Sequence, residues 1–185
     1  IDFNLLHYLK KQYIDNASDR LFFGKLEPPT IIPIPKTEQQ KHVAENAKRM
    51  GENSLKEGKV GAILVAGGQG TRLGFEGPKG MYKIGPISGK SLFQLFAEYI
   101  SALNKRYSTL IPWFIMTSET NHQQTIDYFT ENKFFGLNSN DIYFFKQGMI
   151  PALDPDGKVF LHAKDHIFVN ANCLVKAIDV FQSPI

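Results

Sequence analysis

Three short apolar runs alternate with two stretches of helical periodicity across the middle of the chain. The apolar runs, 60–66, 111–117 and 142–145, are each long enough for one buried strand. The stretches 91–103 and 119–132 repeat their apolar residues at the spacing of amphipathic helices. Strand, helix, strand, helix, strand is typical of a parallel sheet covered by helices. We therefore predict an α/β fold, a Rossmann-like and mainly parallel sheet with helices on both faces.

Two capping-box patterns mark where helices begin. Thr37 followed by Gln40 predicts a helix start, and the polar stretch behind it continues to about Lys56. This helix has few apolar positions, so we expect it on the surface. Ser91 followed by Gln94 predicts a second capping box, at the start of the first helix between strands.

The ends of the chain follow a different pattern. Residues 2–23 have the spacing of one or two amphipathic helices, and the four prolines of 27–36 predict an extended connector. We interpret 1–57 as a helical arm and linker that packs on an α/β domain, 58–185. A protein-binding proline motif is the alternative for the connector. Asp154-Pro155-Asp156-Gly157 predicts a turn in a hairpin-like excursion over 149–161, and a short strand (167–172) and a helix (174–181) follow.

Composition narrows the class of protein. Apolar residues make up 43% and charged residues 21%, as in ordinary globular proteins. A net charge of +3 is too small to argue for nucleic acid. Cys173 is the only cysteine, so no internal disulfide can form, and a reducing, cytoplasmic setting is favoured. There is no long apolar run or signal peptide, so we expect no membrane association. Because Ile1 is not methionine, we expect a piece of a longer protein.

The first apolar run leads directly into a glycine-rich loop that carries two cations. The segment from Ala66 to Met81 reads AGGQGTRLGFEGPKGM. Such loops bring backbone N–H groups up to a phosphate, and Arg72 and Lys79 would add charged donors. The P-loop and the dinucleotide fingerprint both fail here on spacing, since Gly80 follows the lysine and Leu73 stands where a glycine is required. A plain turn between strand and helix is the alternative.

If the predicted sheet is parallel, the ends of the other two strands lie beside the glycine-rich loop. Ligands of open α/β sheets lie at the carboxyl ends of the strands, where Gly67, Thr117-Ser118 and Gln147 would meet. The Gln147 amide can both donate and accept, which suits the edge of a nucleobase; a loop glutamine satisfied within the protein is equally consistent. The five histidines have no cysteine partners at ligand spacing, which argues against a zinc site. We predict no metal ligands in this chain.

These residues resemble the eukaryotic-type UDP-sugar pyrophosphorylases, and within them the UDP-N-acetylhexosamine pyrophosphorylases. The likeness rests on Thr71-Arg72-Leu73-Gly74 and Pro78-Lys79-Gly80-Met81, and it extends downstream through the segments 91–94, 134–137 and 144–152. It covers roughly 59–158. The resemblance implies a nucleotidyltransferase fold of the GT-A-like kind, of which this chain holds the first half of the catalytic domain.

The resemblance also implies a reaction. UTP and N-acetylglucosamine 1-phosphate would give UDP-N-acetylglucosamine and pyrophosphate with Mg²⁺, whose ligands would lie beyond this chain. Arg72 and Lys79 would stabilise charge in the transition state, and Gln147 would read the uracil. The residues assigned to nucleotide binding are Ala66, Gly67, Gly68, Gly70, Thr71, Gln147 and Gly148.

One departure from the family pattern concerns an asparagine that binds the uridine and the sugar. The family flanks it with glycines, whereas this chain reads Asn170-Ala171-Asn172-Cys173, with Asn172 as the matching candidate. A UTP-binding homologue without catalysis, and a pyrophosphorylase for another hexose 1-phosphate, are therefore alternatives. We expect the 185-residue piece alone to be inactive.

Overall fold

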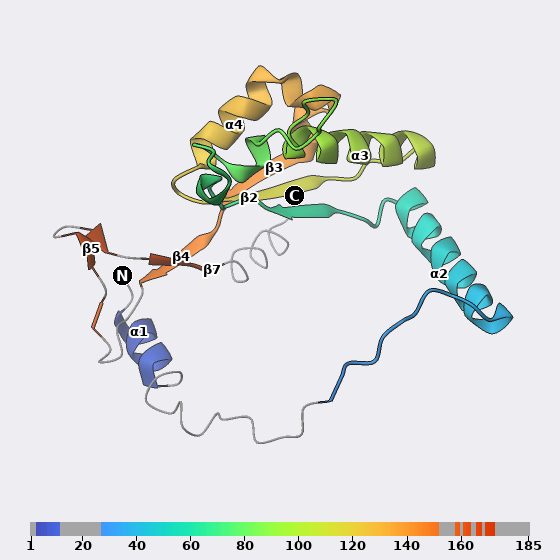
Figure 1. Cartoon of the computed structure of the whole chain (residues 1–185), viewed down its shortest axis with the longest axis horizontal. Coiled ribbons are helices and arrows are strands. Elements are labelled where there is room, and N and C mark those ends of the chain that lie inside the picture. Colours follow the sequence, from blue (N-terminus) through green and yellow to red (C-terminus); the bar gives the residue numbers. More distant parts are fainter. Residues whose placement is uncertain are drawn as a thin grey trace. The chain divides into compact units, whose positions relative to one another are not determined.

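The computed structural model describes residues 3–11, 27–151, 158–159, 161–163, 166–167 and 169–172 (Figure 1). The chain divides into two compact units. One consists of residues 1–34 and 149–170, and the other of 35–148 and 171–185. The domain boundary after residue 57 stays a prediction.

The larger unit is built on a three-stranded parallel sheet, as the alternating pattern predicted. Its strands are β1 (Ala62–Val65), β2 (Trp113–Thr117) and β3 (Ile142–Lys146), in the order β1-β2-β3. Ala62, Trp113 and Ile142 stand side by side in the register. All three strands therefore end at the same edge of the sheet, where the predicted strand-end residues meet.

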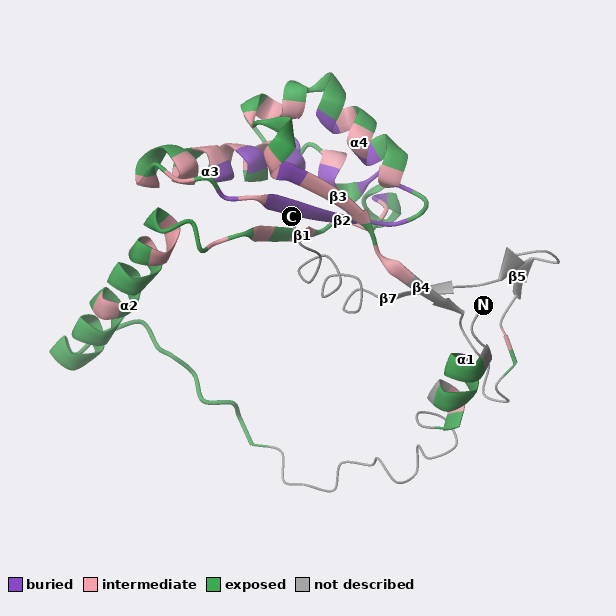
Figure 2. Cartoon of the chain, turned by 180° about the vertical axis from the view of Figure 1, so that it is seen from behind, coloured by how far each residue is buried: buried purple, intermediate pink, exposed green. Residues whose placement is uncertain are grey.

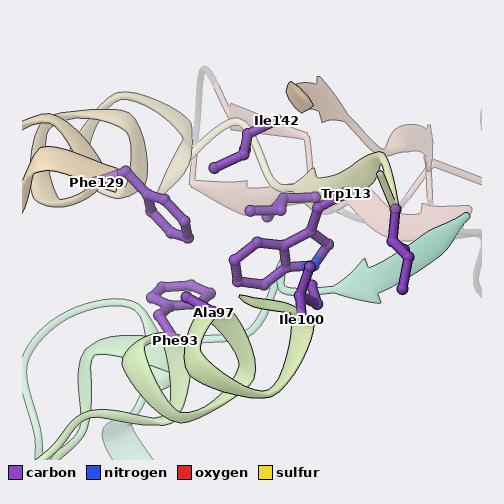
Figure 3. Close-up of a cluster of buried hydrophobic side chains, with 8 residues drawn as sticks. Phe93, Ala97, Ile100, Trp113, Phe129 and Ile142 are labelled. Atoms are coloured by element: carbon purple, nitrogen blue, oxygen red, sulfur yellow. The ribbon is translucent and has the colours of Figure 1, made fainter. Parts of the chain in front are cut away.

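Two helices pack on one face of this sheet. Both α3 (Leu92–Tyr107) and α4 (His122–Glu131) lie on the side formed by alternate strand residues (Figure 1). Figure 3 shows Phe93 of α3 and Phe129 of α4 facing Trp113. The ring centroid of Phe129 lies 5.1 Å from that of Phe93 and 5.4 Å from that of Trp113. The core cluster of buried side chains consists of Phe93, Ala97, Ile100, Ile111, Trp113, Ile115, Phe129 and Ile142. Burying each large apolar side chain stabilises the unit by about 1.5–3 kcal/mol.

We predicted helices on both faces of the sheet. The two described helices that pack on it, α3 and α4, lie on the same face. On the opposite face of β1, the side chains of Ile63 and Val65 are 46% and 63% exposed. Their neighbours in the register on that face are Phe114 and Met116, which are both buried.

Helix α2 (Glu38–Lys56) confirms the first capping box. The Thr37 hydroxyl accepts from the Gln40 backbone N–H at 3.2 Å, and the side-chain Oε1 of Gln40 accepts from the Thr37 N–H at 3.1 Å. No residue of α2 is buried, as its polar pattern predicted, and Figure 2 shows it exposed along most of its length.

The second capping box is only half formed. The Ser91 hydroxyl accepts from the Gln94 N–H at 3.2 Å. The Gln94 side chain does not turn back, because it donates to Glu98 one helical turn further on, at 3.0 Å. Glu98 also accepts from Lys90 at 2.7 Å, and that charged hydrogen bond lowers the pKa of Glu98. This bond turns the Gln94 amide along the helix, away from the Ser91 N–H that its oxygen would accept from in a capping box, so the prediction for Gln94 was wrong.

The remaining described elements are short. Helix α1 (Phe3–Lys10) confirms a helix in the first stretch, and residues 27–36 run exposed and without helix or strand, as the prolines predicted (Figure 1). Strands β4 (Gly148–Pro151) and β7 (Val169–Asn172) pair with each other. Strands β5 (Leu161–Ala163) and β6 (His166–Ile167) form an antiparallel pair. The turn at 154–157 and the helix at 174–181 lie outside the described residues.

None of the helices in the described ranges combines the length and the hydrophobicity that crossing a bilayer requires.

Candidate functional site

The glycine-rich loop leaves the end of β1 and folds back on itself. Gln69 and Pro78 form an antiparallel bridge, and the Lys79 N–H donates to the Gly68 carbonyl at 3.1 Å. The Gly70 N–H donates to the Gly77 carbonyl at 2.8 Å. These bonds close a compact loop that returns Lys79 to the place where the loop began.

Lys79 therefore lies over the first glycines. It opens the 3₁₀ turn η4 (Lys79–Met81), and its Nζ is 4.0 Å from where a Cβ on Gly68 would stand. Its side chain is exposed, and among the described residues no carboxylate pairs with it. A cation without an acidic partner beside exposed backbone is suited to bind an anion.

Arg72 occupies a different part of the loop. It stands on the 3₁₀ turn η3 (Thr71–Leu73) with an exposed side chain, and no carboxylate of the described residues pairs with it either. The contacts of the loop join Lys79, but not Arg72, to the end of β1.

The first and third strand ends meet at Gly67 and Gln147. A Cβ on Gly67 would lie 2.5 Å from Oε1 of Gln147, which is closer than real Cβ atoms come to an oxygen. A larger residue at Gly67 would have to displace the end of the Gln147 side chain. The convergence predicted from the parallel sheet is therefore confirmed for these two residues, while their roles toward a ligand stay a prediction.

The predicted nucleotide residues divide by what their backbone does. Gly70 uses its N–H inside the loop, and its carbonyl accepts from Leu73 and Phe75, so this glycine shapes the loop. The Thr71 carbonyl caps the 3₁₀ turn by accepting from Gly74. Among the described residues, the N–H groups of Gly67 and Gly68 meet no acceptor. These two N–H groups are the ones suited to a ligand.

The other two predicted residues lie after the third strand. Gly148 is the first residue of β4, directly after Gln147. Asn172 ends β7, the strand that pairs with β4. The backbone pairing thus connects the segment that holds the predicted substrate residue with the strand that follows Gln147.

A small cavity lies where the loop closes over β1. Its volume is about 100 Å³, and the residues that line it are Leu64, Val65, Ala66, Gly68, Lys79, Gly80, Leu92 and Phe93. Pockets that enclose a whole small molecule measure roughly 300–1,000 Å³. This cavity can therefore hold one part of a nucleotide, beside the Lys79 ammonium.

The end of the second strand contributes residues that sequence reasoning missed. Asn121 is fully buried, and its side chain joins the end of β1 to the end of β2. The available signal was the polar run 117–121, which follows a fully buried apolar strand. Polar side chains in such a position are buried only when hydrogen bonds satisfy them.

His122 lies next to this edge and has a lowered pKa. Burial disfavours the charged imidazolium, and the nearby Lys146 ammonium lowers the pKa further, while Glu119 opposes the shift. Lys146 and Glu119 are themselves an ion pair at 2.5 Å. His122 Nδ1 lies 2.7 Å from the Thr117 hydroxyl. The neutral ring is therefore the form that the fold favours.

Acidification should destabilise the protein through His122. Because the folded pKa lies below the ordinary value, the unfolded chain takes up the proton first, so stability is lost as the pH falls from about 6.5 toward the folded pKa. We expect the melting temperature of the full-length protein to fall less between about pH 7.5 and pH 5.5 in His122→Asn than in the wild type. The asparagine amide can keep the hydrogen bond to Thr117 without titrating. Equal pH dependence in both proteins would contradict the assignment.

Metal-ligating side chains do not cluster in the part of the chain that the structure describes. No three histidine, cysteine, aspartate or glutamate side chains in the described ranges gather where they could hold a metal ion. The described part of the loop therefore does not fit a metal site made of its own side chains.

Comparisons with known proteins agree with this architecture. Residues 7–171 match the family model described as UTP--glucose-1-phosphate uridylyltransferase. The chain is 45% identical over 139 residues to the UDP-N-acetylglucosamine pyrophosphorylase of Saccharomyces cerevisiae, which covers 71% of this chain and 29% of the yeast protein. It is 40% identical over 148 residues to UDP-N-acetylglucosamine diphosphorylase 2 of Arabidopsis thaliana, covering 71% of this chain and 30% of that protein.

A solved structure extends the likeness to the fold. The uridine diphosphate N-acetylglucosamine pyrophosphorylase from Trypanosoma brucei, crystallised with an inhibitor, superimposes with a TM-score of 0.78 at 25% identity. The match covers 92% of this chain and 35% of the trypanosomal one. The chain thus spans about a third or less of the relatives it matches. Because the family model matches residues 7–171, most of its length, the chain belongs to the UTP--glucose-1-phosphate uridylyltransferase family.

Proposed function

We propose that the full-length protein is a uridylyltransferase that makes UDP-N-acetylglucosamine and pyrophosphate from UTP and N-acetylglucosamine 1-phosphate. The observation that carries the proposal is the closed loop, which returns Lys79 to Gly68 beside the Gly67–Gln147 contact. A cation for phosphates and an amide for a base thus lie against two successive glycines at one sheet edge. The names of the relatives in yeast and Arabidopsis support the choice of sugar.

The reaction is a displacement at phosphorus. A phosphate oxygen of the sugar 1-phosphate forms a bond to the α-phosphorus of UTP, and the bond between that phosphorus and the bridging oxygen to the β-phosphorus breaks. Pyrophosphate leaves with the electron pair. The work left to the protein is to hold the two reactants in line and to neutralise the charge that builds on the phosphate oxygens.

Each residue of the site is assigned one role in this reaction. The N–H groups of Gly67 and Gly68 would donate to the nucleotide, and Gln147 would donate to and accept from the uracil edge. Lys79 would stabilise the transition state and the departing pyrophosphate, with Arg72 adding charge from η3. Asn172 is proposed to contact the uridine and the sugar.

The metal, the domain organisation and the location of the protein belong to the same proposal. Mg²⁺ would accompany UTP, but the described residues do not form a site for it, so we derive no step through the metal. The segment 58–185 would be the N-terminal part of the catalytic domain, with 1–57 as its arm and linker. A cytoplasmic location is supported by Cys173, the only cysteine of the chain.

The test is pyrophosphate release by the full-length protein. It is incubated with UTP, Mg²⁺ and, in separate reactions, N-acetylglucosamine 1-phosphate, N-acetylgalactosamine 1-phosphate or glucose 1-phosphate. We expect the first to give the highest kcat/KM, and the 185-residue chain alone to give no turnover. Fastest turnover with another of the three would reassign the sugar. UTP binding without pyrophosphate from any of them would identify a binding homologue instead.

A further inference from the structure

Two polar side chains at the end of β2 are completely buried. Thr117 ends the strand and Asn121 follows four residues later, and both are 0% exposed. Each reaches a different neighbouring strand: Asn121 contacts the end of β1, and Thr117 contacts the end of β3. The two residues therefore lie between the strand that leads to Gly67 and the strand that leads to Gln147.

Asn121 holds the peptide group in front of Gly67. Its Nδ2 donates to the Ala66 carbonyl at 3.0 Å, and its Oδ1 accepts from the Ser118 N–H at 2.8 Å, so both ends of the amide are used. The Ala66 carbonyl and the Gly67 N–H belong to one planar trans peptide and point in opposite directions. Fixing the carbonyl therefore fixes the direction of the Gly67 N–H.

Thr117 holds the backbone that leads to Gln147 in two places. Its hydroxyl donates to the Phe145 carbonyl at 3.1 Å, and its own carbonyl accepts from the Gln147 N–H at 2.7 Å. Because the hydroxyl has a single hydrogen, it is left to accept from His122 Nδ1. The backbone N–H of Gln147 is thus fixed relative to β2.

The side-chain hydrogen bonds of Thr117 and Asn121 connect the strand ends beyond the last backbone hydrogen bond between β1 and β2. The backbone ladder between β1 and β2 ends where the Ala66 N–H donates to the Met116 carbonyl at 2.7 Å. Past that point, the side chain of Asn121 supplies the next connection between the two strand ends. The contact between Gly67 and Gln147 lies one residue further along, so its spacing depends on these buried hydrogen bonds.

We propose that Thr117 and Asn121 are positioning residues for the nucleotide site. Acting through Ala66 and Phe145, they set the separation and orientation of Gly67 and Gln147, and thereby the affinity and base selectivity for the nucleoside triphosphate. This inference rests on the proposed function. Both side chains are fully buried, so they act through the backbone and not by touching the nucleotide.

The test uses the full-length protein and compares binding of UTP and ATP by calorimetry. In Thr117→Val and Asn121→Ala, we expect the Kd for UTP to rise about tenfold, because a lost buried hydrogen bond lets the strand end move. The preference for UTP over ATP should fall in both variants. Thr117→Ser keeps the hydroxyl and should stay within about twofold of the wild type.

Thr125→Val is the matched control. Thr125 is also fully buried on α4, and its hydroxyl donates to the Asn121 carbonyl at 2.7 Å and not to a strand-end carbonyl. We expect this variant to lower the melting temperature as Thr117→Val does, while leaving both affinities unchanged. If Asn121→Ala does not fold, Thr117→Val with Thr117→Ser decides the question by itself.

Two results would overturn the inference alone. One is wild-type UTP affinity and selectivity in Thr117→Val and Asn121→Ala, and the other is an equal loss of affinity in Thr125→Val. A wild-type protein that binds no UTP would overturn the proposed function as well.

Discussion

Replacing Lys79 with alanine in the full-length protein is expected to lower kcat for pyrophosphate release about 100-fold or more, the usual cost of removing one donor to transition-state charge. The loop places the Lys79 Nζ within 4.0 Å of where a Gly68 Cβ would stand, and no carboxylate of the described residues competes for it. Its charge is therefore available to phosphate oxygens. The KM for UTP should rise less than kcat falls, since the charge grows in the transition state.

Lys83→Ala is the control for this prediction. Lys83 is exposed and lies four residues further along, beyond η4, where its backbone forms a bridge with Ser91. Its loss removes the same charge from the same region and should leave kcat within about twofold. Equal losses in Lys79→Ala and Lys83→Ala would show a diffuse charge effect, and full activity in Lys79→Ala would remove it from the mechanism.

Replacing Gly80 with alanine should destabilise the fold strongly. A Cβ at this position would lie 2.2–2.4 Å from three ring atoms of Phe93, a fully buried side chain in the centre of the core. The ring cannot move away, because Phe129 packs against it with centroids 5.1 Å apart. We expect the free energy of unfolding to fall by about 2 kcal/mol or more, the cost of overpacking a core.

The stability of Gly80→Ala is measured by denaturant unfolding of the full-length protein. Gly51→Ala is the control, since Gly51 lies within α2 and a Cβ there would meet no atom within 4 Å. That change should be neutral, or stabilising by up to about 1 kcal/mol through helix propensity. Because Lys79 and Gly80 share the turn η4, the folded fraction of Gly80→Ala should also show reduced kcat. Unchanged stability would mean that the core does not depend on this close approach.

The parts of the molecule that the sequence predicted are those governed by local rules. Hydrophobic periodicity placed the three strands, and the parallel order then brought Gly67 and Gln147 together, although 80 residues separate them by number (147 minus 67). The capping box at Thr37 needs only residues three apart, and it formed as predicted.

The parts that could not be predicted depend on which partner a polar group selects. The Gln94 amide donates to Glu98 instead of accepting from the Ser91 N–H, a choice that depends on where Lys90 holds the Glu98 carboxylate. Asn121 bonds to the Ala66 carbonyl, 55 residues away, and no spacing rule identifies that carbonyl. Gly70 belongs to the motif, but the loop uses its N–H internally. Motif matching names residue types and does not assign each hydrogen bond.

In the proposed function, the edge where Gly67 and Gln147 meet reads the base of UTP. The most direct measurement compares wild type and Gln147→Ala, as full-length proteins, for binding of UTP and of inorganic tripolyphosphate. We expect about tenfold weaker UTP binding in Gln147→Ala, the cost of the lost hydrogen bonds to the base, with unchanged affinity for tripolyphosphate. Wild-type UTP affinity in Gln147→Ala, or an equal loss for both ligands, would contradict it.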